Sequence, residues 1–255
     1  MKHIDRQILQ IALPSIVSNI TVPLLGLIDV AIVGHLGSPA YIGAIAVGGM
    51  LFNIIYWIFG FLRMGTSGMT SQAYGKRDLP EIVRLLMRSV GIGLAVALCL
   101  ILLQVPIRQA AFLIIHPTAE VREMATLYFH ICIWGAPAML GLYGLSGWFI
   151  GMQNSRIPMY IAITQNIVNI IASLSFVCFF KMKVEGVAFG TLIAQYAGFI
   201  MGLVLWMSRY GKLKKYILWK GVLQKEAMMR FFQVNRDIFL RTLCLVTVTL
   251  FFNTI

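Results

Sequence analysis

The sequence opens with an apolar run from Ile8 to Leu36, which exceeds the roughly 20 residues that a membrane-spanning helix needs. Asp29 is the only ionisable residue between Ile8 and Val33. A carboxylate at membrane depth costs at least ~2.5 kcal/mol on insertion scales, so such residues are rare and mark ion or substrate pathways. Pro23 removes a backbone donor and predicts a bend in the helix near the acid. We therefore expect Asp29 to bind a proton or a cation; the alternative is a neutral carboxyl with a structural hydrogen bond.

Composition indicates an integral membrane protein. Its 255 residues are 59% hydrophobic and only 12% charged, whereas soluble domains carry about 25% charged residues. We predict an all-α integral membrane protein, because a membrane-spanning helix satisfies its own backbone hydrogen bonds. The four cysteines fall in apolar runs without CxxC spacing, which favours neither a disulfide framework nor a metal site.

Six complete membrane spans are predicted, followed by the start of a seventh. They cover about 8–36, 41–70, 86–106 (ended by Pro106), 124–150, 158–180 and 186–207, and the seventh apolar run begins near Ile238. Residues 107–121 are predicted to form a short amphipathic helix at the membrane surface. Lys and Arg side chains gather on one side of this arrangement, which predicts a cytoplasmic N-terminus. The net charge of +12 is thereby assigned to loops at the membrane, and no nucleic-acid partner is expected.

One short segment recurs. Ile4-Asp-Arg-Gln-Ile-Leu9 resembles Val234-Asn-Arg-Asp-Ile-Phe239, and repeated halves with sites near the midplane are typical of secondary transporters. We expect three parts: a six-helix lobe over 1–207, a basic amphipathic linker over 208–233, and over 234–255 the truncated first helix of a second lobe. The chain is then expected to associate with that second lobe or with itself.

Polar side chains inside the fifth and sixth spans are the other candidates for a site. They are Gln165, Asn166, Asn169, Ser173, Thr191 and Gln195. Asn169 and Ser173 are four residues apart, as are Thr191 and Gln195, so each pair shares a helix face. Such groups need partners in lipid, commonly on a neighbouring helix. Together with Asp29 they could form a small cation or proton site, with Gln165, Asn166 and Gln195 lining a cavity.

Signatures of enzymes and of ATP hydrolysis are absent from the sequence. It contains no GxxxxGK[ST], no HExxH and no serine triad. We expect no enzymatic activity and no cofactor, and the energy for any transport must come from an ion gradient. Sodium at the Asp29 site is the one metal ion considered.

Three segments carry a family resemblance. They are the Asp29-Val-Ala-Ile-Val-Gly-His-Leu-Gly37 segment that follows Pro23, the Ser71-Gln-Ala-Tyr-Gly75 turn and the Gly151-Met-Gln-Asn-Ser-Arg-Ile-Pro158 turn. These segments resemble the multidrug and toxic compound extrusion (MATE) transporters, nearest the DinF-like branch. The resemblance covers essentially the whole chain. It implies a two-lobed antiporter of twelve helices in the bacterial inner membrane, which exports cationic or amphipathic compounds in exchange for protons or sodium.

The resemblance also implies roles for individual residues. Asp29 falls on the first-span acid of that branch, and Asn169 and Thr191 fall on an amide and a hydroxyl near the acid. Ser173 stands where many relatives carry a second aspartate. Two alternatives remain open at this point: a lipid or oligosaccharide flippase of the same superfamily, and an inactive truncated membrane fragment.

Overall fold

The computed structural model describes residues 12, 16, 20, 30–32, 34, 39–217, 221, 222 and 224–253, with no side chains at 242, 243 and 245–253. Every regular element in this part of the chain is helical. The elements are α2 (Pro39–Ile58), α3 (Gly60–Gly75), α4 (Leu79–Leu102), α5 (Gln104–Ile115), α6 (Ala119–Cys132), η1 (Ile133–Gly135), α7 (Ala136–Gly151), α8 (Arg156–Leu174), the π-helical turn η2 (Ser175–Phe179), α9 (Val184–Tyr210), η3 (Gly211–Tyr216) and α10 (Lys225–Asn253).

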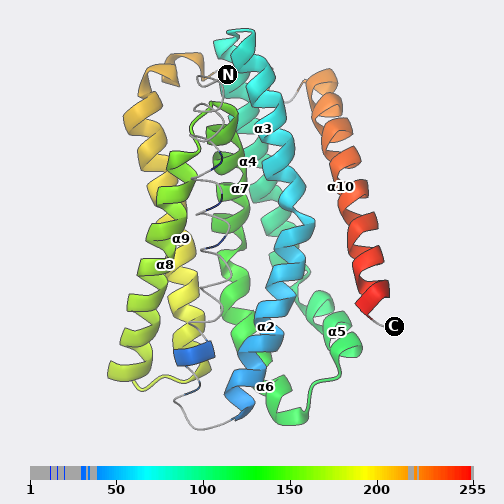
Figure 1. Cartoon of the computed structure of the whole chain (residues 1–255), viewed down its shortest axis with the longest axis vertical. Coiled ribbons are helices and arrows are strands. Elements are labelled where there is room, and N and C mark those ends of the chain that lie inside the picture. The colour runs from blue at the N-terminus through cyan, green and yellow to red at the C-terminus, as the bar shows by residue number, and fades with distance from the viewer. Residues whose placement is uncertain are drawn as a thin grey trace.

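Five helical segments of the described chain are long and apolar enough to cross a membrane. They are Pro39–Gly75, Leu79–Leu102, Ala119–Gly151, Arg156–Phe179 and Val184–Tyr216. They confirm the predicted second to sixth spans in order, while most of the predicted first span lies outside the described residues. Figure 1 shows these segments as a bundle of roughly aligned helices. The turn after α3 and the basic η3 lie at one end of the bundle, and the turn between α8 and α9 lies at the other (Figure 1).

Proline chemistry moves one boundary from its predicted place. The third span ends at Leu102 rather than at Pro106, and Pro106 lies in the first turn of α5. Because proline has no N–H, it cannot bond to the Leu102 carbonyl four residues earlier, and its ring clashes there. The helix therefore breaks at Leu103, and α5 leaves the bundle at an angle (Figure 1). A short helix is thus present, but it begins before the predicted residue 107.

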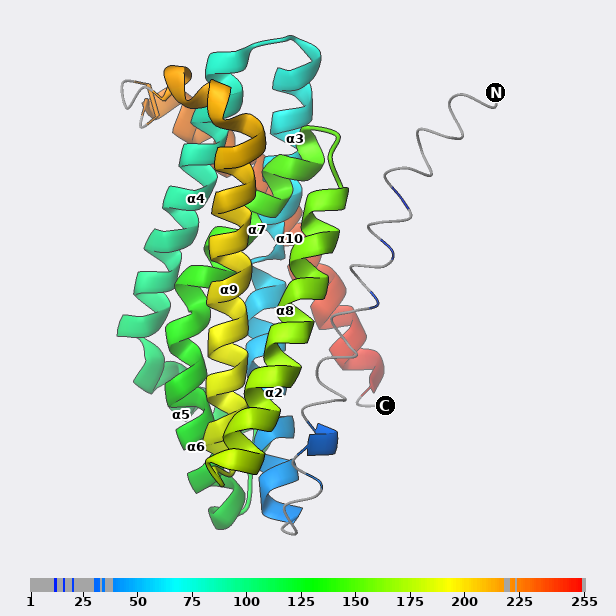
Figure 2. The ribbon, with the colours of Figure 1, turned by 90° about the vertical axis from the view of Figure 1, so that its left-hand side faces the viewer.

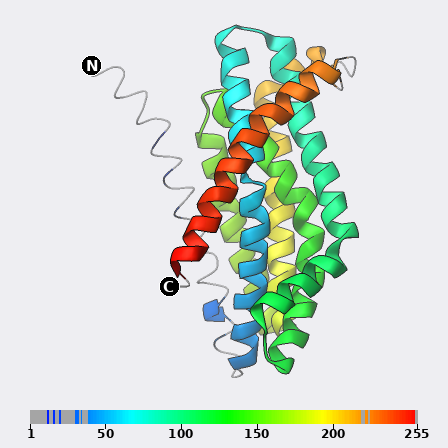
Figure 3. The same ribbon diagram turned by 90° about the vertical axis from the view of Figure 1, so that its right-hand side faces the viewer.

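The last helix also begins earlier than predicted. α10 starts at Lys225 rather than near Ile238, so residue 233 lies inside a helix. Phe231 in its second turn is buried against a core cluster that includes Leu62 and Met69 of α3. This packing stabilises helical structure in a segment whose charge suggested a linker. Figure 3 shows α10 crossing the bundle obliquely, and Figure 2 shows it on the far side of the bundle from α9.

Glycines in α7 let the central helix contact its neighbours closely. A Cβ at Gly144 would lie 3.1 Å from the backbone nitrogen of Val90 on α4, and one at Gly147 would collide with the Arg63 carbonyl on α3. Small residues at such positions allow helices to pack where lipid supplies no hydrophobic driving force between them. α7 is therefore the helix around which α3 and α4 are arranged.

Candidate functional site

Two of the predicted site residues meet between α8 and α9. The Asn169 side chain of α8 donates a hydrogen bond from Nδ2 to the Thr191 Oγ1 of α9, at 3.1 Å. Asn169 is completely buried. Because the amide N–H is directed to Thr191, the carbonyl oxygen of the same amide faces elsewhere. The hydrogen bond thus fixes which atom of Asn169 remains available to a ligand.

Oxygens without a partner gather around this hydrogen bond. Asn169 Oδ1 and Ser173 Oγ are both buried and form no hydrogen bond in the described structure. Ser173 follows Asn169 by one helical turn, on the same face of α8. Leaving a buried polar group unpaired costs about 1–3 kcal/mol, so two such oxygens one turn apart are unusual in a well-packed protein core. Their chemistry suits a small cation or a donated proton, because hard cations take oxygen ligands.

A glycine on α9 brings the two helices together at this point. A Cβ at Gly190 would collide with the Ser173 Oγ and would also lie 2.8 Å from the Ser173 backbone nitrogen. Only a residue without a side chain can therefore occupy position 190 at this helix separation. Gly190 is a site residue that the sequence analysis missed, and the signal available was its place next to Thr191.

The polar strip of α9 continues one turn beyond Thr191. The Gln195 side chain lies against Gly135 of η1, and its Oε1 is buried without a hydrogen bond. The buried Tyr56 of α2 lies beside this amide, and its hydroxyl likewise lacks a hydrogen bond of good geometry. Gln195 therefore connects the Asn169 side of α9 with the break between α6 and α7. Tyr56 was also missed by the sequence analysis, because a tyrosine in an apolar span carries no distinguishing pattern.

Two further candidates are placed less centrally. Gln165 packs its side chain against Gly198 of α9, so it belongs to the α8–α9 contact, away from the Asn169 end. Asn166 is half-buried on α8. The structure therefore brings Asn169, Ser173 and Thr191 together and places Gln165 farther along the α8–α9 contact, against Gly198.

Asp29 and Pro23 lie outside the described residues. Val30 and Ile32 are described, and they pack against a core cluster that contains Val177 and Ala188. Val177 follows Ser173 on the chain by one turn, and Ala188 precedes Thr191 by three residues. Val30, which follows Asp29, thus packs against the same core cluster that contains Val177 and Ala188.

Comparisons with known proteins agree with this architecture. The profile of the MatE family matches residues 14–175. DNA damage-inducible protein F of Escherichia coli (strain K12) is 38% identical over 245 residues, which cover 94% of this chain and 52% of that protein. Protein DETOXIFICATION 44, chloroplastic, of Arabidopsis thaliana is 27% identical over 221 residues, covering 80% of this chain and 41% of that protein.

Solved structures show the same fold. A crystal structure of MATE in the bent conformation superposes with a TM-score of 0.87 at 19% identity, covering 98% of this chain and 56% of that chain. The chain spans about half the length of the curated relatives it matches. Its helices correspond to the N-terminal lobe of these transporters. The chain belongs to the MatE family, the multidrug and toxic compound extrusion transporters.

Proposed function

We propose that this chain forms the first lobe of an antiporter that exports cationic or amphipathic compounds in exchange for protons or sodium. The observation that supports the proposal is the hydrogen bond from Asn169 to Thr191, which leaves Asn169 Oδ1 buried and unpaired beside Ser173 Oγ. The family consists of multidrug and toxin efflux transporters, so an ion site within one lobe has an immediate use in coupling.

In this proposal Asp29 supplies the charge and the neighbouring oxygens supply selectivity for its occupant. An amide oxygen only accepts hydrogen bonds, and an ionised carboxylate is also only an acceptor. Asn169 Oδ1 can therefore pair with a protonated Asp29 or share a cation with it, but it cannot pair with the bare carboxylate. Occupancy by a proton or sodium ion changes these contacts, and the bend expected at Pro23 transmits the change along the first helix.

Transport by the whole protein is proposed to need a second lobe. Two lobes with a site near the midplane are how many secondary transporters are built, and the matched relatives are about twice as long as this chain. We further propose that the end carrying η3 is cytoplasmic, because Lys212, Lys214 and Lys215 lie there and cytoplasmic loops carry the excess of Lys and Arg.

The decisive test is Asp29→Asn in a transporter with both lobes. The amide keeps the shape of the side chain and is cheaper in the membrane than a charge, so expression and insertion should stay normal. Gradient-driven efflux of a cationic dye should be abolished, because the amide cannot exchange a proton or neutralise a cation. Asp237→Asn is the matched control, since Asp237 lies on α10 with 70% of its side chain exposed. Normal efflux by Asp29→Asn at equal protein levels would refute the proposal.

The neutral oxygens should contribute less than the acid. Asn169→Ala, Ser173→Ala and Thr191→Ala each remove one uncharged ligand, so each should weaken coupling without abolishing it. Ser175→Ala is a control in the π-helical turn that follows α8, because the Ser175 hydroxyl donates to the Ile171 carbonyl of α8. Equal efflux in Asn169→Ala and in the control would remove Asn169 from the site.

A further inference from the structure

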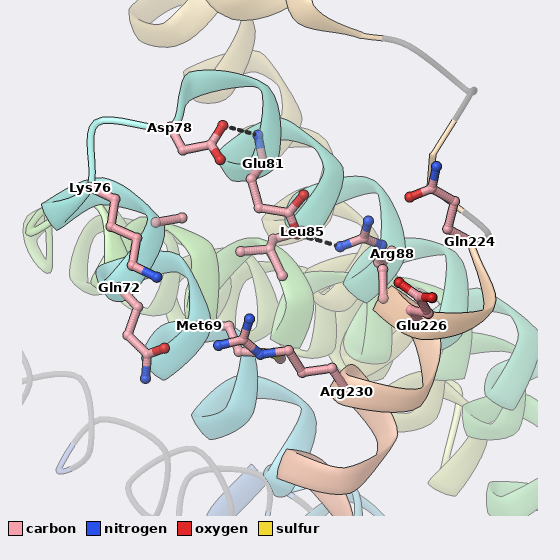
Figure 4. A pocket seen from close by; sticks show the side chains of 12 residues that line it. Met69, Gln72, Lys76, Asp78, Glu81, Leu85, Arg88, Gln224, Glu226 and Arg230 are labelled. Atoms are coloured by element: carbon pink, nitrogen blue, oxygen red, sulfur yellow. Dashed lines mark hydrogen bonds and ion pairs between the residues drawn. The ribbon is translucent and has the colours of Figure 1, made fainter.

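A buried arginine joins α4 to the chain segment that precedes α10. The Arg88 side chain is 2% exposed and pairs with Glu81 of its own helix, Nη1 to Oε1 at 2.6 Å. Its Nε donates to the Val222 carbonyl and its Nη2 to the Gly221 carbonyl, each at 2.8 Å. Figure 4 shows the Arg88–Glu81 pair as a dashed line. Arg88 therefore connects positions more than 130 residues apart in the chain.

The chemistry of this contact is specific to arginine and to this backbone. The guanidinium is a planar fork with five N–H donors, and here it donates to one carboxylate and two carbonyls. Gly221 has φ +102°, a region that residues with a Cβ rarely adopt. The glycine thus lets two successive carbonyls face the same side chain. Neither feature was anticipated from the sequence.

The first turns of α10 contact α3 through the buried Phe231, and they also border a cavity. This cavity of about 440 Å³ is shared with α3 and α4, and it is lined by charged side chains that include Lys76, Glu226 and Arg230 (Figure 4). Lys76 and Arg230 form no ion pair with another described residue. Farther along α10, Asn235 is buried and packs so closely on Gly65 of α3 that a Cβ there would collide with its amide.

We propose that Arg88 is a positioning residue that fastens residues 221 and 222 to α4 and thereby fixes where the first turns of α10 lie relative to α4. These turns are then held by this attachment on one side and by the Phe231 and Asn235 contacts with α3 on the other, beside the charged cavity. The attachment itself does not depend on the proposed function. A role for it in transport rests on the proposed function, because α10 is the helix that leads toward the proposed second lobe.

Spin-label distances in the full chain, reconstituted in lipid after replacement of its native cysteines, test the proposal. Labels at Leu79 of α4 and Met229 of α10 report on the first turns of α10, and labels at Leu79 and Leu240 report beyond the Asn235 contact; all three side chains are at least one-third exposed. Arg88→Gln should broaden or shift the 79–229 distance distribution and leave the 79–240 distribution nearly unchanged. An unchanged 79–229 distribution in a folded Arg88→Gln protein overturns the proposal.

Three further variants separate the hydrogen bonds from charge and from folding. Arg84→Gln removes the other arginine that pairs with Glu81, at 3.5 Å, and should leave both distributions as in the parent. Arg88→Lys keeps the charge but not the fork, so it should behave like Arg88→Gln; parental behaviour would mean that charge alone is sufficient and would overturn the assignment. If Arg88→Gln does not fold, Gly221→Ala disturbs the same contact from the carbonyl side and should broaden the 79–229 distribution, and no change would again overturn the proposal.

Discussion

The indole nitrogen of Trp148 on α7 donates a hydrogen bond to the Ile82 carbonyl on α4, at 2.9 Å. Trp148 is completely buried, and it also lies edge-on against Tyr210 at the end of α9, with 4.9 Å between ring centroids. One side chain therefore joins three helices near the basic end of the bundle.

The first prediction concerns this contact. Trp148→Ala should lower the stability of the protein by about 3 kcal/mol, because it leaves a cavity among three helices and removes a hydrogen bond. Trp134→Ala should cost much less, since Trp134 is 54% exposed. The difference is measured by heating each variant in detergent and monitoring the loss of its monodisperse peak with temperature. Similar midpoints for the two variants would contradict the assigned role of Trp148.

The second prediction concerns the separation of α8 and α9. Gly190→Ala should destabilise the α8–α9 contact by about 1–3 kcal/mol, as overpacking does. Combining it with Ser173→Ala should not restore stability, because the new methyl group would still lie 2.8 Å from the Ser173 backbone nitrogen. Gly68→Ala is the control: nothing lies within 4 Å of its Cβ position. Recovery in the double variant would show that the hydroxyl alone sets the distance.

A contrasting result is expected where α10 meets α3. Gly65→Ala should displace α10, because the three atoms nearest to its Cβ position belong to the Asn235 side chain. Asn235→Ala removes those atoms, so the double variant should regain most of the stability that Gly65→Ala loses. A double-mutant cycle on thermal stability measures the coupling. Purely additive losses would mean that the two residues do not share this contact.

The fourth prediction tests the proposed orientation. Single cysteines in place of Lys214 in η3 and Thr118 before α6, in a cysteine-free background, should react with a membrane-impermeant thiol reagent from opposite sides. Lys214→Cys should be labelled from the cytoplasmic side and Thr118→Cys from the outside. Labelling of both from the same side would exclude the arrangement of spans described here.

The five described spans and the need for partners at Asn169 and Thr191 could be predicted from the sequence. Hydropathy and a helical repeat are local properties, and a polar side chain in lipid must find a partner. Which helix provides that partner is a property of the packed bundle. The bonds from Arg88 to residues 221 and 222 join segments far apart in the chain, and no local pattern distinguishes Arg88 from Arg77 and Arg84 nearby.

The start of α10 shows the same limit from the other direction. Charge and amphipathic spacing suggested a linker over residues 208–233, and the structure begins α10 within it, at Lys225, with Phe231 buried against α3. Likewise, Gly190 looks like any small residue of a membrane span until the Ser173 backbone is placed against it. Asn235 follows the same rule, since only its contact with Gly65 distinguishes it.

The π-helical turn at Ser175–Phe179, which begins two residues after Ser173, has a consequence for how the protein tolerates change in length. The Phe180 N–H bonds to the Ser175 carbonyl five residues earlier, so this turn holds one residue more than an α-helical turn needs. Because a π-helical turn accommodates one extra residue, deleting one residue here would return the turn to α-helical spacing and leave the chain beyond it close to its present place. Lys183, whose ammonium lies over the Tyr41 ring at 5.4 Å, would keep that contact, and Asn169 and Ser173 would keep their places. The same deletion in the regular part of α8 would instead rotate the residues beyond it by ~100°, so this turn is where the α8–α9 hairpin tolerates a change in length.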